Sequence, residues 1–213
     1  LKDSTLEHLE LNDCGALTSL ATLATCRNLR FVRLCGGIQI SDLSPLAYCP
    51  IETLELKNCT GLTLLDGLEK DTLLCLDLTA CGSVKSCGAL AGCRNIEVIR
   101  GLECSEVNFE TFSKLKRLME LQVTDKMSVS LGQETMPKSL MNLSLHCRSI
   151  QDINALDKCK HLQRLDLRGC RALSQLDLIQ NLPLQVQNNF IFVHQHFAFE
   201  SNHTISILQL FTV

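Results

Sequence analysis

Thirteen cysteines are the residues of this 213-residue chain most able to do chemistry, as metal ligands, disulfides or reactive thiols. Zinc sites favour closely paired ligands such as C-x-x-C, and the sequence contains no such pair. Cys75, Cys81, Cys87 and Cys93 do follow one another at six-residue intervals. In a repeating coil, Cys75 would project from a strand while the other three surround the core. We therefore expect no metal site.

Most of the cysteines recur at fixed places of a sequence period of 22 or 23 residues. The ninth place holds Cys14, Cys59, Cys81, Cys104 and Cys170, and the twenty-first holds Cys26, Cys49 and Cys93. A buried free cysteine acts as a small hydrophobe with a weak donor, which suits inward-facing rows. Disulfides between stacked neighbours such as Cys59 and Cys81 are the alternative. The odd total and the repeat-wise placement favour reduced thiols.

The six histidines offer no catalytic arrangement. His8 and His146 fall on predicted strands, His161 ends a connecting segment, and His194 and His196 form an H-x-H pair. Two ligands do not make a metal site. No nucleophile elbow, phosphate loop or paired carboxylate motif is present. We predict that this segment is not an enzyme and takes no cofactor.

Three N-glycosylation sequons begin at Asn58, Asn142 and Asn202, and they would matter in a secreted protein. Asn142 falls on a predicted strand, where a glycan would block the surface that the strands form. We interpret the three sequons as incidental.

The spacing of the cysteines is part of a longer pattern, L-x-x-L-x-L-x-x-C-x-x-L, which occurs eight times. The repeats begin at Leu6, Leu29, Ile51, Leu73, Ile96, Leu118, Leu140 and Leu162. Self-similarity at a fixed short period is typical of solenoid proteins. The fifth repeat departs from the pattern, because Gly101 stands where a second apolar residue is expected.

Each x-L-x-L-x stretch alternates as a strand with one buried face does, and one copy cannot bury that face alone. Stacked copies predict a parallel sheet about 35 Å long, with the residues between the leucines on an outer, concave wall. In the return segments, which connect one strand to the next, apolar residues recur at every third position, as in Leu17, Leu20 and Leu23. This spacing favours 3₁₀ or irregular structure. The predicted fold is an α/β solenoid, a horseshoe with a thin convex side.

Segments such as L-E-H-L-E-L-N-D-C-G-A-L and L-Q-R-L-D-L-R-G-C-R-A-L resemble leucine-rich repeats of the cysteine-containing kind, over residues 6–182. The segment C-T-G-L-T-L-L-D-G-L is similar to segments of trypanosomatid leucine-rich repeat proteins, a group that includes an adenylate cyclase regulatory protein. This resemblance implies a regulatory role. F-box proteins also carry cysteine-containing repeats, but theirs are usually longer, and no F-box-like segment precedes these.

Composition favours a protein partner over other classes. The net charge is -3, so no basic surface indicates nucleic acid. The sequence has no apolar run long enough to span a membrane and no signal-peptide pattern. We expect a cytoplasmic protein, with an extracellular surface as the alternative. Because the chain starts at Leu1 without a polar capping unit, we expect residues 1–5 to be the incoming end of a longer array.

The composition changes over residues 183–213. This segment has one charged residue, Glu200, and five of the eight phenylalanines. Strands are predicted at 189–193 and 204–208. The segment is either a cap over the last repeat or an abnormal chain end, with a docking element ranked behind.

Two outward columns of the concave wall form the candidate partner-binding site. Phe31, Thr53, Cys75 and Val98 make an apolar stripe in the third place of repeats two to five. The charged residues Arg33, Glu55, Asp77 and Arg100 flank it in the fifth place. An apolar centre with a charged rim is typical of protein interfaces. We predict an interaction scaffold of unknown partner, with the substrate arm of a ubiquitin ligase or a surface receptor as alternatives.

Overall fold

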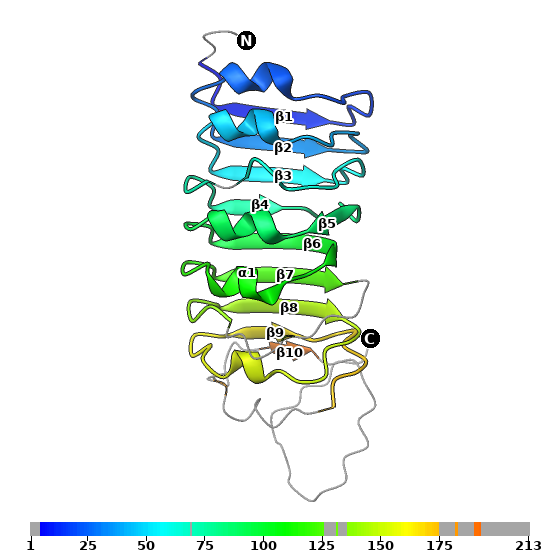
Figure 1. The fold of residues 1–213 in the computed structure, drawn as a ribbon, viewed down its shortest axis with the longest axis vertical. Helices are drawn as coiled ribbons and strands as arrows, with labels where there is room; N and C mark the ends of the chain where they lie inside the picture. Colours follow the sequence, from blue (N-terminus) through cyan, green and yellow to red (C-terminus); the bar gives the residue numbers. More distant parts are fainter. Residues whose placement is uncertain are drawn as a thin grey trace, which may run out of the picture.

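The chain forms a stack of parallel strands with short helices over one face, as predicted (Figure 1). The computed structural model describes residues 5–68, 70–125, 131, 136–174, 182 and 190–192. Within these ranges the strands join in one open, uncurled sheet. The predicted α/β solenoid is therefore confirmed.

Each of the eight repeats contributes one strand where the pattern predicted it. The strands are β1 (His8–Asn12), β2 (Phe31–Cys35), β3 (Thr53–Lys57), β4 (Cys75–Asp77), β6 (Val98–Glu106), β7 (Glu120–Asp125), β8 (Asn142–Cys147) and β9 (Arg164–Asp166). Successive strands pair residues of the same repeat place, such as Leu54 with Leu76. The leucine rows are buried from the second repeat on, as at Leu54, Leu56 and Leu76, whereas Leu9 and Leu11 of the first repeat are partly buried. The predicted register is confirmed.

The return segments are thin, as their rhythm of three predicted. Four are 3₁₀ helices: η1 (Ala21–Thr25), η2 (Ser44–Tyr48), η3 (Gly88–Gly92) and η4 (Asn154–Leu156). In the third repeat, Leu62, Leu65 and Leu68 are buried from an irregular segment. The fifth repeat differs, because it forms a single α-helical turn, α1 (Phe109–Ser113). The Asn108 side chain caps that turn by accepting a hydrogen bond from Glu110 N at 2.9 Å.

The turn after several strands uses the left-handed backbone region. The eighth place of five repeats has positive φ: Asp13, Gly36, Asn58, Ala80 and Gly169. Glycine adopts this conformation freely, and Asn and Asp tolerate it better than other residues do. Four of the five positions have a suited residue, and Ala80 is the exception.

Buried cysteine thiols donate hydrogen bonds to carbonyls of the preceding repeat. All thirteen cysteines are free, and ten are buried. In the ninth place, Cys59 and Cys170 donate to carbonyls of the preceding strand, Leu34 O at 3.6 Å and Leu145 O at 3.0 Å. In the twenty-first place, Cys49 donates to Leu23 O at 3.1 Å. The rows satisfy buried carbonyls between stacked repeats, which is the role that the sequence predicted.

The fifth repeat contains a β-bulge that corrects two sequence assignments. Between Ile99 and Leu102 the pairing of β6 with β7 shifts by one residue. Leu102 is at the seventh place of its repeat, where alternation from the outward third and fifth places predicts an outward side chain, but the shift leaves it fully buried. Cys104, assigned to the turn row, lies instead within β6 and pairs with Asp125. The short strand β5 (Val84–Ser86) pairs with the extended part of β6.

Beyond the repeats, the strand predicted at 189–193 appears as β10 (Phe190–Phe192), which is parallel to β9. The strand predicted at 204–208, the H-x-H pair at 194–196 and the sequon at Asn202 lie outside the described residues. Whether 183–213 is a cap or an abnormal end stays a prediction. No helix formed by the described residues is long and apolar enough to cross a membrane.

Candidate interaction surface

The predicted apolar stripe is a continuous row in the structure. Phe31, Thr53, Cys75 and Val98 are paired in register on β2, β3, β4 and β6. All four side chains are partly exposed, because they project from the face opposite the buried leucines. The sheet therefore brings together residues that are 22 or 23 positions apart in the sequence.

The flanking charges lie in a second row, directly beside the stripe. Arg33, Glu55, Asp77 and Arg100 are also paired in register. Their exposure differs strongly. The Arg100 side chain is 47% exposed, whereas the Asp77 side chain is only 7% exposed. Seven of the eight predicted binding residues thus reach the surface, and Asp77 lies beneath it.

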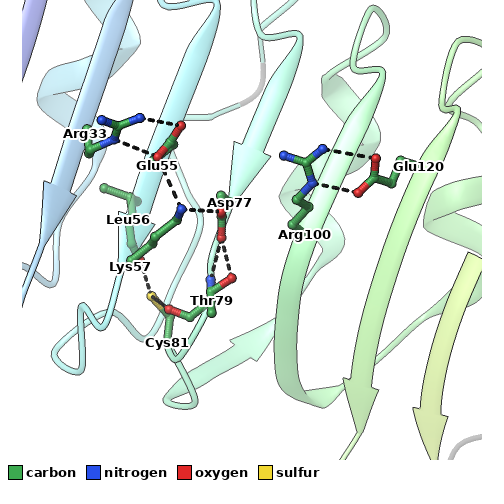
Figure 2. Close-up of polar contacts among 9 residues, drawn as sticks. All are labelled: Arg33, Glu55, Leu56, Lys57, Asp77, Thr79, Cys81, Arg100 and Glu120. Carbon is green, nitrogen blue, oxygen red and sulfur yellow. Dashed lines mark hydrogen bonds and ion pairs between the residues drawn. The ribbon is translucent and has the colours of Figure 1, made fainter. Parts of the chain in front are cut away.

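A network of ion pairs joins the charges of the first four strands (Figure 2). Arg33 binds Glu55 through two hydrogen bonds, Nε to Oε2 at 2.8 Å and Nη2 to Oε1 at 3.3 Å. Its Nη1 reaches Glu10 Oε1 at 3.2 Å. Lys57 Nζ continues the chain to Glu55 Oε2 at 3.5 Å and to Asp77 Oδ2 at 3.1 Å. Each of these five charges is paired with at least one other of the set, usually from a neighbouring strand.

These contacts shift the pKa values of the carboxylates. Hydrogen bonds from Arg33 lower the pKa of Glu55. Burial alone would raise the pKa of Asp77, but hydrogen bonds from Thr79 and Lys57 outweigh it and lower the pKa. Thr79 donates to Asp77 Oδ1 from its Oγ1 at 2.6 Å and from its backbone N at 2.9 Å. Both carboxylates are therefore held ionised, and their positions are fixed.

The Phe31 ring is also held in place. His8 stacks on it with ring centroids 5.7 Å apart, and the Arg33 guanidinium lies 5.2 Å from its centroid. An aromatic ring ordered before binding loses little conformational entropy when a partner docks. Phe31 is thus a prearranged apolar contact at one end of the stripe.

At the other end of the stripe, Arg100 forms a separate pair. Its Nε and Nη2 bind Glu120 Oε1 and Oε2 at 2.6 and 3.1 Å. Asp77 is directly opposite Arg100 in the sheet, yet the Arg100 side chain turns toward β7 (Figure 2). The sequence pattern did not identify the partners Glu10, Lys57 and Glu120. Opposite charges about one repeat apart were the signal that could have done so.

The structure also brings together Ser144 and His146 of β8 and Asp166 of β9. Ser144 Oγ lies 3.2 Å from His146 Nε2, and Asp166 Oδ2 lies 3.4 Å from the same nitrogen. A catalytic triad needs the acid on one ring nitrogen and the nucleophile on the other. This cluster therefore does not form a triad. The described residues contain no group of three or more His, Cys, Asp or Glu side chains able to hold a metal ion.

No protein-family model matches the chain, and no curated protein matches its sequence. The narrower resemblance to the trypanosomatid group therefore stays a prediction. Solved structures do match. Internalin C2 from Listeria monocytogenes str. 4b F2365 is similar with a TM-score of 0.74 and 22% identity, over 88% of this chain and 80% of that one. The leucine-rich repeat domain of the type III effector XopL is similar with a TM-score of 0.62 and 20% identity, over 89% and 69%.

Proposed function

We propose, from the leucine-rich repeat fold that this chain has, that its outer sheet face binds a partner protein over strands β2 to β6. The observation that carries the proposal is the in-register row of Phe31, Thr53, Cys75 and Val98. Partly buried apolar residues in a contiguous row suit the centre of an interface, and charged residues suit its rim.

The internal ion pairs support this function in a second way. Because Arg33, Glu55 and Lys57 already bond to one another, their side chains are ordered without a partner. Ordering long side chains opposes association, so a surface ordered in advance binds at a lower entropic penalty. The balanced charges also mean that the partner needs no strong opposite field.

We propose further that the protein acts by binding and not by catalysis, and that occupancy of this face regulates the partner, as the resemblance implies. A cytoplasmic location is part of the proposal. It is supported by the thirteen free cysteines, ten of them buried, because free thiols persist in reducing compartments.

The test is affinity capture from native cells with the wild-type chain and two variants. Phe31→Asp combined with Val98→Asp places carboxylates in the stripe and should abolish capture of specific partners. Leu64→Asp is the matched control, because Leu64 is 47% exposed in a return segment, away from the stripe. Equal melting temperatures would show that all three proteins are folded. Retention of every partner by the stripe variant would overturn the proposal.

A further inference from the structure

Arg33 and Arg100 occupy the same column of the outer face, and they are bound differently. Arg33 holds two carboxylates: Glu55 through Nε and Nη2, and Glu10 through Nη1. Arg100 holds one carboxylate, Glu120, through Nε and Nη2. Within the described ranges no hydrogen bond or ion pair reaches Arg100 Nη1, so the end of this guanidinium is open.

Asp77 is the residue expected to bind the free end of the Arg100 guanidinium, but it already binds other groups. Glu10 is paired opposite Arg33 in the sheet, and the equivalent residue opposite Arg100 is Asp77. Asp77 has a shorter side chain, and its oxygens bind Thr79 and Lys57. Figure 2 shows Asp77 among these groups, with Arg100 turned toward Glu120. The charge row is consequently interrupted between β4 and β6.

The β-bulge makes this interruption a built feature of the sheet. Gly101 has φ +60°, and a Cβ there would lie 2.5 Å from Thr79 Cα, so only glycine fits. Bulges commonly re-aim a side chain at functional positions. Here the bulge lies between Ile99 and Leu102 and therefore includes Arg100, the most exposed charged side chain of the predicted row.

We propose that Arg100 receives an aspartate or glutamate side chain of the partner protein, in the position that Glu10 occupies at Arg33. This inference rests on the proposed function and names the chemistry that its binding face recognises. Glu120 fixes the guanidinium, and Nη1 and the second hydrogen of Nη2 donate two charge-assisted hydrogen bonds to the incoming carboxylate. Val98 and Cys75, beside Arg100, contact an apolar side chain next to that acid. The partner is therefore a protein segment with an acidic residue adjacent to an aliphatic one.

The test uses random peptides displayed on phage and selected on the full chain. Peptides that lose binding to Val98→Asp define the face-dependent set. In that set, replacing the acidic residue by its amide should weaken binding about tenfold, and Arg100→Gln should weaken it by the same factor. The two changes together should weaken binding no further, because they remove one interaction.

Two further variants distinguish the effect of the planar guanidinium geometry from the effect of its positive charge. Arg100→Lys keeps the charge but lacks the planar fork, so it should lose most of the affinity. Arg117→Gln is the control, because Arg117 is similarly exposed and paired with Glu97 but lies outside the two rows. Face-dependent peptides without a coupled carboxylate would overturn the role of Arg100 and leave the proposed function standing. A selection without face-dependent peptides would overturn both.

Discussion

The ammonium of Lys70 donates a hydrogen bond to the carbonyl of Leu46, at a point where the neighbouring repeats use a cysteine. Cys49 donates to Leu23 O and Cys93 donates to Leu68 O at the equivalent place. The third repeat has Asp71 where those repeats have the cysteine. Lys70 also reaches Cys49 O at 3.2 Å, and burial lowers its pKa. A lysine thus replaces a thiol as the donor between repeats.

Replacing Lys70 by methionine should destabilise the protein by about 1–2 kcal/mol, because buried carbonyls lose their donor while the apolar stem is kept. Urea unfolding of the two proteins measures the difference. Adding Asp71→Cys to the Lys70→Met variant should recover most of the lost stability, since the thiol would stand where Cys49 and Cys93 stand. Failure of the second change to restore any stability would show that Lys70 acts differently.

Replacing Ala80 with glycine should stabilise the folded protein. Its φ is +63°, a conformation that opposes a Cβ, and its side chain is exposed. Ala80→Gly should stabilise the protein by about 0.5–1 kcal/mol, despite the greater flexibility of glycine in the unfolded chain. Thermal unfolding would measure the change. Ala172→Gly, at an exposed position without positive φ, is the control and should not stabilise. Equal effects at both sites would contradict the assigned turn.

Thiol reactivity should follow burial. Cys14, Cys35 and Cys75 are partly exposed, and the other ten cysteines are buried. In the folded protein a thiol reagent should modify these three cysteines before the others. Among the three, Cys75 should react most slowly, because burial raises its pKa. The remaining thiols should react after unfolding. Rapid modification of most thiols in the folded state, or a count showing disulfides, would contradict the fold and the reducing compartment together.

Acid should weaken the ion network at Glu55. Arg33 lowers the pKa of Glu55 in the folded protein, so the contribution of this carboxylate is present above its unfolded pKa, about 4.3, and is lost as the pH falls through the lower folded value. Glu55→Gln should therefore be less stable than the wild type at pH 7, and the gap should close in acid. Urea unfolding across that pH range tests this, and a constant gap would refute it.

The period of the sequence was sufficient to predict the strands, their register and the thin return segments. Burial at Leu54 and Leu76 follows directly from alternation along a strand, and the positions of Phe31 and Val98 on the outer face follow from the same rule. The cysteine rows were predictable for a related reason. A residue that recurs at one place of every repeat meets the same surroundings each time.

The structure differs from the sequence-based predictions where local contacts, which the repeat period does not encode, decide how a side chain is placed. The β-bulge between Ile99 and Leu102 turns Leu102 inward, and counting residues within a repeat cannot show where a strand bulges. The burial of Asp77 depends on Thr79 and Lys57, whose side chains cover it from two directions. The substitution of Lys70 for a thiol depends on the reach of a flexible side chain. These features decide which charges remain available to a partner.

The most direct test of the central claim is site-specific photo-crosslinking from the stripe. A photoreactive amino acid at Thr53, in the middle of the row, should crosslink to the captured partner in native cells. The same group at Leu64, outside the row, should give no crosslink to that partner. Crosslinks from Leu64 without any from Thr53 would contradict the assignment of the outer sheet face as the binding surface.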